Sequence, residues 1–218
     1  MSPSRPRRLI VVAGTATEIG KTWVAARLLR ELRAEGRDVA ARKPVQSFDP
    51  DDALTDAHLL GDASGEAATD VCPRHRWLPI PMAPPMAADS LGRPPFTIAD
   101  LAAEITWPVP TPDIGIVECV GGVRSPHASD GDAISLIEEL QPDLLLLVAD
   151  AGLGTVNAVR LSLEAIDRGA HVATPIVVLN RFDPTDELHR RNRDWLESTL
   201  PVEVLSSVPA VMNRLRPS

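Results

Sequence analysis

The sequence predicts a three-layer α/β fold in which a mainly parallel central sheet is flanked by helices. Short apolar runs that suit buried strands alternate along the chain with longer stretches of helical periodicity. The 218 residues, 44% of them apolar, are enough for one hydrophobic core. We therefore expect residues 1–218 to form a single domain, with residues 1–8 as a frayed tail.

The first predicted elements are a strand, a glycine-rich turn and a helix. Residues 9–13 are an apolar, branched run typical of a strand that is buried on both faces. Residues 22–35 carry apolar side chains at helical spacing, and Gly36 suits the end of that helix. Residues 39–42 are predicted to form a short second strand, which places Lys43 at its carboxyl end.

Strands and helices continue to alternate through the remainder of the chain. Helices are predicted at residues 52–61 and from Thr97 to about Glu104, with an extended proline-rich loop at residues 73–95 between them. Later helices are expected at residues 132–140, 156–168 and 186–198. Three further buried strands, at residues 114–117, 144–149 and 175–179, end at Glu118, Asp150 and Asn180. Ligands bind at the carboxyl ends of strands in such sheets, so these ends and Lys43 mark the expected site.

The turn after the first strand has the form of a phosphate-binding loop. It reads Gly14-Thr15-Ala16-Thr17-Glu18-Ile19-Gly20-Lys21-Thr22 and lies between a predicted strand and a predicted helix. In that setting backbone amides and the positive end of the helix converge on phosphate groups. Lys21 is expected to contact the outer phosphates of a nucleotide, and the Thr22 hydroxyl to bind magnesium.

Lysine occurs at only two positions, Lys21 and Lys43, among 22 basic residues that are otherwise arginine. An ammonium is a compact charge on a flexible stem, whereas a guanidinium is planar and permanently charged. Both lysines lie inside motifs, where they can reach a phosphate oxygen or lie near a reacting amine. We interpret the chain as an enzyme with Lys21 and Lys43 as its catalytic residues.

Two acidic residues at strand ends compete for the role of magnesium ligand. Magnesium prefers an oxygen shell that contains one or two carboxylates. Glu118 and Asp150 both follow buried apolar strands. Glu118 is favoured because Gly121 and Gly122 follow it and permit close approach of the backbone to a ligand.

Composition argues against several other classes of protein. The net charge of −8 is spread without a long acidic or basic block, so we expect no nucleic-acid partner. Cys72 and Cys119 lack metal-binding spacing and are expected to be reduced thiols. No apolar stretch approaches the ~20 residues needed to cross a bilayer. We therefore expect a cytoplasmic location and no membrane partner.

Several motifs together resemble the dethiobiotin synthetase family. They are the loop Gly-Thr-x-Thr-Glu-x-Gly-Lys-Thr, the segment Lys43-Pro44-Val45-Gln46-Ser47, and the strand end Glu118-x-x-Gly121-Gly122. The resemblance also takes in Asp56-Ala57, residues 81–84, residues 154–157 and Asn180, and so covers most of the chain.

This resemblance implies a P-loop NTPase-like fold and a ligase that depends on ATP and magnesium. Members of the family build the ureido ring of dethiobiotin from diaminopelargonate and carbon dioxide and release ADP and phosphate. By resemblance, Lys43 would hold the carbamate and the transferred phosphoryl group, and Lys21 the β and γ phosphates. The residues assigned in this way to ATP are Glu18, Ile19, Gly20, Lys21, Thr22, Trp23, Asp56, Glu118, Gly121, Asn180 and Pro209.

The same resemblance implies a metal site and a composite substrate site. Thr22, Asp56 and Glu118 would arrange magnesium. The implied substrate residues are Thr17, Lys43 and Ser47 and, from the neighbouring subunit of a homodimer, Gly154, Thr155, Val156 and Asn157. Amides at the start of the helix after Thr155 would favour the substrate carboxylate.

Four residues depart from the family's usual pattern. Phe48 stands where glycine is usual, Cys119 and Val120 replace Gly-Ala, and Ala16 replaces an acid in the phosphate loop. Phe48 and Cys119 are expected to add bulk beside the substrate. A P-loop relative with an altered substrate and an inactive nucleotide-binding regulator therefore remain as alternatives. A nucleotide-dependent partitioning switch is disfavoured, because such proteins typically carry an extra lysine near the start of the loop, where this chain has Gly14-Thr15-Ala16-Thr17.

Overall fold

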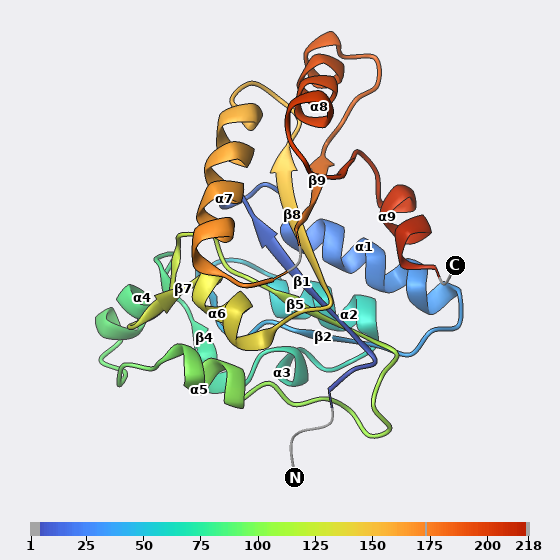
Figure 1. The fold of residues 1–218 in the computed structure, drawn as a ribbon. Coiled ribbons are helices and arrows are strands. Elements are labelled where there is room, and N and C mark those ends of the chain that lie inside the picture. Colours follow the sequence, from blue (N-terminus) through green and yellow to red (C-terminus); the bar gives the residue numbers. More distant parts are fainter. Residues whose placement is uncertain (1–4, 173, 217–218) are drawn as a thin grey trace.

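The central feature of the fold is a six-stranded parallel sheet (Figure 1). The computed structural model describes residues 5–172 and 174–216. The strand order is β10-β9-β8-β1-β5-β2. The strands are β1 (Arg8–Gly14), β2 (Val39–Arg42), β5 (Ile114–Glu118), β8 (Leu144–Asp150), β9 (Ile176–Asn180) and β10 (Val204–Leu205). The predicted α/β fold class is thus confirmed.

Helices cover both faces of this sheet because its strands are apolar on both sides. In β1, Ile10 and Val12 belong to one hydrophobic cluster and Leu9 and Val11 to the other. The cluster of Ile10 also takes side chains from α1 (Lys21–Ala34), α2 (Asp56–Ser64), α3 (Ala68–Val71) and α9 (Val208–Leu215). The opposite cluster takes them from α4 (Pro84–Ser90), α5 (Ile98–Ala103), α6 (Ala133–Leu140), α7 (Thr155–Gly169) and α8 (Glu187–Thr199). Figure 1 shows α7 and α1 on opposite sides of the sheet.

The proline-rich segment is not the extended loop that was predicted for residues 73–95. It contains the short helix η1 (Arg74–Arg76), the strand β4 (Trp77–Leu78) and the helix α4. Pro84 and Pro85 occupy the first turn of α4, where the missing N–H leaves no helical hydrogen bond unmade. β4 pairs with β3 (Gln46–Ser47), and β6 (Pro126–Ala128) pairs with β7 (Gly131–Asp132), beyond the main sheet.

The prediction of a frayed tail at residues 1–8 is wrong for residues 5–8. Pro6 is buried, and Arg8 is the first residue of β1. Arg5 donates to the carbonyl of Gln141 at 2.7 Å and lies 3.1 Å from Asp143. Residues 1–4, the other half of that tail, lie outside the described residues. Among the helices of the described chain, not one combines the length and apolarity that crossing a membrane requires.

The parallel topology brings chemically distinct strand ends to one edge. β1 ends at Gly14, β5 at Glu118 and β9 at Asn180, while Lys43 directly follows β2. Because these strands run in the same direction, their carboxyl ends meet at the same edge of the sheet. A ligand-binding site is therefore expected at this edge of the sheet.

Candidate functional site

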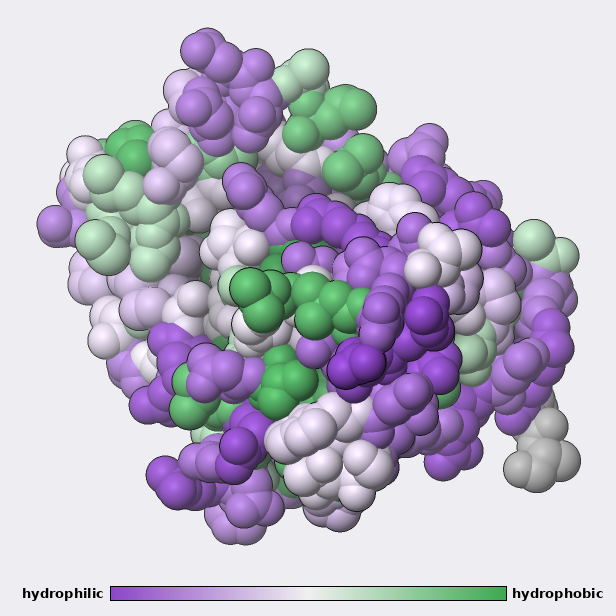
Figure 2. Space-filling model, turned by 90° about the horizontal axis from the view of Figure 1, so that it is seen from above, coloured by the Kyte–Doolittle hydropathy of each residue, from purple (hydrophilic) through white to green (hydrophobic). Residues whose placement is uncertain are grey.

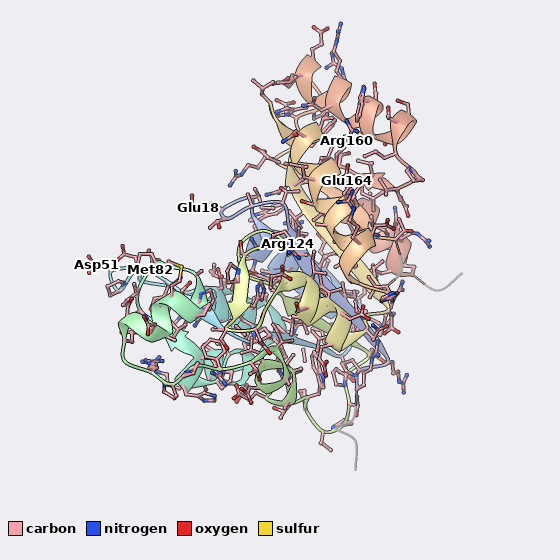
Figure 3. The ribbon with its side chains drawn as sticks, turned by 60° about the vertical axis from the view of Figure 1, so that its left-hand side comes forward. Glu18, Asp51, Met82, Arg124, Arg160 and Glu164 are labelled. Atoms are coloured by element: carbon pink, nitrogen blue, oxygen red, sulfur yellow. The ribbon has the colours of Figure 1, made fainter. Side chains whose placement is uncertain are left out.

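Two adjoining cavities open where these strands end. The larger has a volume of about 1080 Å³ and the smaller about 530 Å³. Gly20 and Arg181 line both, so the cavities share a wall. Figure 2 shows this face of the molecule, on which hydrophobic residues lie among hydrophilic ones. In Figure 3, Glu18 lies on the loop after β1, and Met82 lies on the segment before α4, another part of the larger cavity's lining.

The loop between β1 and α1 forms the floor of the site. Five residues separate Gly14 from Gly20, one more than in the common phosphate-binding pattern. Gly20 has a φ of +90°, and a Cβ atom there would lie 2.1 Å from Nδ2 of Asn180. Asn180 in turn donates from Nδ2 to the carbonyl of Ile19 at 2.8 Å. Glycine is therefore required at position 20, and the end of β9 holds the loop in place.

Lys43 lies between two carboxylates. Its ammonium is 2.7 Å from Oδ2 of Asp56 and 2.5 Å from Oε1 of Glu118. The hydroxyl of Thr22 lies 2.9 Å from Oδ1 of Asp56 and 2.9 Å from Oε1 of Glu118. A hydroxyl has a single hydrogen, so Thr22 donates to one carboxylate at a time. The start of α1, the start of α2 and the ends of β2 and β5 thus converge on one polar cluster.

Burial and mutual charge shift the pKa values of this cluster. Burial, followed by the Lys43 charge, lowers the pKa of Lys21 to about 8. Burial also acts against the charge of Lys43, but Asp56 and Glu118 outweigh it and raise the Lys43 pKa above its ordinary value. At Asp56 burial acts to raise the pKa, but the charge and hydrogen bond of Lys43, together with the hydrogen bond of Thr22, outweigh burial and lower it. At Glu118 burial dominates and raises the pKa. Lys43 is therefore an ammonium at neutral pH, and Lys21 is the lysine that titrates nearest to neutrality.

The oxygens of Thr22, Asp56 and Glu118 fit magnesium. They comprise one hydroxyl and two carboxylates, the hard donors that this ion prefers when phosphate oxygens and water complete its shell. Oε2 of Glu118 is buried and has no hydrogen-bond partner within the described residues. Residues 5–172 and 174–216 contain no cluster of three acidic, histidine or cysteine side chains, so a metal here would need ligands from phosphate or water.

The structure brings most of the predicted site residues together. Thr17, Glu18, Gly20, Lys21, Thr22, Lys43, Ser47, Asp56, Glu118 and Gly121 line the larger cavity. Trp23, Asn180 and Pro209 line the smaller one with Gly20. Ile19 contributes its carbonyl to Asn180, while its side chain is buried in the core.

Residues 154–157 are not brought to these cavities. They lie at the start of α7, and Val156 lines a separate shallow hollow with Trp195 of α8. Asp150, the alternative metal ligand, lines neither cavity, and its carboxylate accepts from the amide of Ala151 at 2.9 Å. Glu118 is therefore the acid at the strand end that faces the site.

The prediction that the Cys119 side chain adds bulk beside the substrate is wrong. The Cys119 side chain is 1% exposed in the hydrophobic core, because side chains alternate between faces at the end of β5. Val120 lines the larger cavity instead, as does Phe48. Phe48 packs edge-on against Trp77, with ring centroids 5.9 Å apart.

Several lining residues have no counterpart among the predicted site residues. Gln46 accepts from the amide of Ala57 at 3.1 Å and so ties β3 to the first turn of α2, which carries Asp56. Ser125 accepts from the amide of Gly122 at 2.9 Å. Phe48 lines the larger cavity as expected, and the remaining unassigned residues of its lining are Gln46, Asp49, Asp52, Leu54, Thr55, residues 81–84, Val120, Ser125, Pro126 and Arg181. The motif Lys-Pro-Val-Gln-Ser was the available signal for Gln46.

Comparisons with known proteins agree with this geometry. A family model described as an AAA domain matches residues 8–215. ATP-dependent dethiobiotin synthetase BioD of Haloferax mediterranei is 36% identical over 203 residues, which is 91% of this chain and 82% of that protein. BioD of Anaeromyxobacter dehalogenans is 36% identical over 222 residues, covering 96% of this chain and 94% of that protein. BioD of Streptomyces coelicolor is 30% identical, covering 96% and 87%.

Solved structures resemble the chain in fold. A ParA family ATPase from Chlorobium tepidum has a TM-score of 0.56 at 16% identity and covers 95% of this chain and 88% of that one. A plasmid partition protein from Borrelia burgdorferi also has a TM-score of 0.56, at 12% identity, covering 97% and 100%. At these identities the likeness describes the arrangement of the sheet and helices.

Proposed function

The chain belongs to the dethiobiotin synthetase family, and from this premise we propose that it closes the ureido ring of dethiobiotin on diaminopelargonate with carbon dioxide and ATP. It is then an ATP-dependent ligase of biotin biosynthesis that releases ADP and phosphate. The observation that supports this most directly is the position of Lys43. Its ammonium lines the same cavity as Lys21 and Thr22 of the phosphate loop.

Each cavity would bind a different part of the substrates of this reaction. The smaller cavity, lined by Trp23, Asn180 and Pro209, would take the adenosine part of ATP. The phosphates would extend over Gly20 and Lys21 into the larger cavity, where backbone amides and the start of α1 favour negative charge. The diamine would occupy the remainder of the larger cavity, near Thr17, Ser47 and Gly121.

Magnesium would be held by Thr22, Asp56 and Glu118 together with phosphate oxygens. When bound, the ion supplies positive charge to the phosphoryl group that is transferred. The unpartnered, buried Oε2 of Glu118 supports this assignment.

Lys43 would stabilise the negative charge that develops on the substrates. One amine captures carbon dioxide as a carbamate, and the γ-phosphoryl group passes to a carbamate oxygen. The second amine then attacks the carbamate carbon, the phosphate leaves, and the ring closes. Such steps require positioning and positive charge more than covalent catalysis by the protein. The raised pKa of Lys43 keeps that charge in place at neutral pH.

A homodimer would complete the substrate site. Residues 154–157 lie at the start of a long helix away from their own chain's cavities, and Leu153 beside them is 92% exposed. In a dimer, the amides at the start of α7 would receive the substrate carboxylate of the neighbouring subunit.

Both cysteines are free thiols, which supports a cytoplasmic location for this reaction.

Phosphate release from magnesium-ATP by the purified protein tests the proposal. Bicarbonate is present throughout, and diaminopelargonate is compared with no amine. We expect release that requires both the diamine and bicarbonate, with dethiobiotin identified as the product by mass spectrometry. ATP binding without diamine-dependent release would overturn the proposal and favour another substrate or a regulatory role.

A further inference from the structure

Arg181 stands at the junction of the two cavities. It directly follows Asn180, the last residue of β9, and lines both the smaller and the larger cavity. Gly20 is the other residue that lines both. A nucleotide with its base in one cavity and its outer phosphates in the other must therefore pass between Gly20 and Arg181.

The backbone around this junction is unusual. Arg181 has a φ of +57°, and Glu18 on the phosphate loop has a φ of +60°. The Nη2 atom of Arg181 donates to the carbonyl of Glu18 at 2.8 Å, so these two left-handed residues are joined directly. Residues other than glycine adopt this conformation where the surrounding structure holds them in it, often at ligand sites.

The Arg181 guanidinium keeps donors available for a ligand. It carries five N–H groups, and its one hydrogen bond within the described residues is the bond to Glu18. It forms no ion pair with any residue in 5–172 or 174–216. By contrast, Lys43 is paired with Asp56 and Glu118 in the larger cavity, and Arg27 in the smaller cavity is 2.7 Å from Glu31.

We propose that Arg181 binds the phosphate chain of the nucleotide where that chain passes from the smaller cavity to Lys21. A guanidinium binds phosphate oxygens through two parallel hydrogen bonds, which suits a fixed position beside the chain. The bond to Glu18 directs the side chain toward the phosphate loop and leaves the other donors for the ligand. This inference rests on the nucleotide site of the proposed function and adds to it a residue that contacts phosphate.

The test compares binding of ADP, ATP and adenosine by calorimetry or competition. We expect Arg181→Gln to raise the Kd of ADP and of ATP about tenfold and to leave the Kd of adenosine within twofold. Arg181→Lys keeps the charge but loses the two-pronged geometry, so its Kd for ADP should fall between those of the wild type and Arg181→Gln. Arg27→Gln is the matched control, and we expect it to affect adenosine and ADP by the same factor.

Two results would overturn the inference. One is an unchanged Kd for ADP in Arg181→Gln, and the other is an equal loss for ADP and adenosine, which would show that Arg181 only shapes the loop. Thermal unfolding checks that each variant folds. If Arg181→Gln does not fold, the Arg181→Lys variant alone tests the inference. We then expect its Kd for ADP to rise threefold or more and its Kd for adenosine to stay unchanged. Because these measurements need no diamine, they stand whether or not ring closure is detected.

Discussion

The ammonium of Lys43 lies 2.5 Å from Oε1 of Glu118, and the two side chains are only 2% and 1% exposed. Charges so deeply buried are tolerated only when they are paired, because each loses its hydration on folding. The pair joins β2 to β5 across the carboxyl edge of the sheet. This contact therefore ties the ends of the two strands together and keeps a positive charge in the larger cavity.

Replacing each of the two lysines should impair a different property of the protein, ATP binding for Lys21 and turnover for Lys43. Lys21→Ala should abolish ATP binding, because its ammonium lies in the phosphate loop. Lys43→Ala should leave the Kd of ATP within a few-fold of wild type and lower kcat by about 10³-fold. Calorimetry for binding and phosphate release for turnover give the two numbers. Equal losses of ATP affinity in both variants would contradict this division of roles.

Removing Lys43 should also destabilise the protein. Glu118 would then be left as an unpaired buried carboxyl, at a cost of about 3 kcal/mol in the free energy of unfolding. The double variant Lys43→Met and Glu118→Gln removes both charges, so we expect it to regain much of the stability but none of the activity. Urea denaturation of the single and double variants measures this difference. No recovery in the double variant would mean that the pair is not the source of the loss.

Nucleotide affinity should weaken as the pH rises through about 8. The pKa of Lys21 is lowered to about 8 in the free protein, and the protonated form is the one that binds phosphate. Above that pH, binding must also recover a proton, so the Kd of ADP should rise up to about tenfold per pH unit. Titrations at pH 7, 8 and 9 measure this slope. Lys21→Arg does not titrate in this range and should show a flat profile if it binds.

His127 should make the protein less stable in mild acid. Its Nε2 accepts from the amide of Val120 at 3.0 Å and its Nδ1 lies 2.9 Å from the carbonyl of Ser125, so the ring is held neutral. Burial lowers the pKa of His127 to about 4. The unfolded chain takes up the proton first, near pH 6.5, so stability falls as the pH drops from 6.5 toward 4, by up to about 3 kcal/mol.

Urea denaturation at pH 7.0, 6.0 and 5.0 measures that dependence. His127→Gln cannot titrate, and its stability should depend less on pH than that of the wild type. His171, which is exposed after the end of α7, is the control position, and His171→Gln should retain the wild-type slope. A wild-type slope in His127→Gln would show that another group is responsible.

Phe48 should affect the diamine more than the nucleotide. Its ring lines the larger cavity and packs on Trp77. Phe48→Gly should change the KM for the diamine several-fold and leave the Kd of ATP unchanged, because Phe48 belongs neither to the phosphate loop nor to the lining of the smaller cavity. Steady-state kinetics with each substrate varied in turn separates the two effects. A change confined to ATP would place Phe48 at the nucleotide instead.

Much of the fold could be predicted because the relevant patterns are local. The apolar run of β1, the helical spacing of α1 and the strand ends at Glu118 and Asn180 are all visible in short windows of sequence. α4 was missed because prolines at the start of a helix look like loop residues when the helix is not known. Two further elements were not predicted. β10 has only two residues, too few to show a pattern, whereas the apolar residues of α9 (Val208, Val211, Met212 and Leu215) do follow helical spacing, a signal that the prediction overlooked.

The sequence by itself determined the chemistry of the site, because the phosphate loop, Lys43 and Glu118 belong to motifs whose residue types are dictated by phosphate and metal binding. Only the tertiary structure decided which groups face one another. The contact of Lys43 with Asp56, the core position of Cys119 and the bond from Arg181 to Glu18 all join or separate residues by the course of the chain in space. Such contacts depend on the order of the strands in the sheet and on the paths of the loops that follow them, and neither leaves a periodic signal in the sequence.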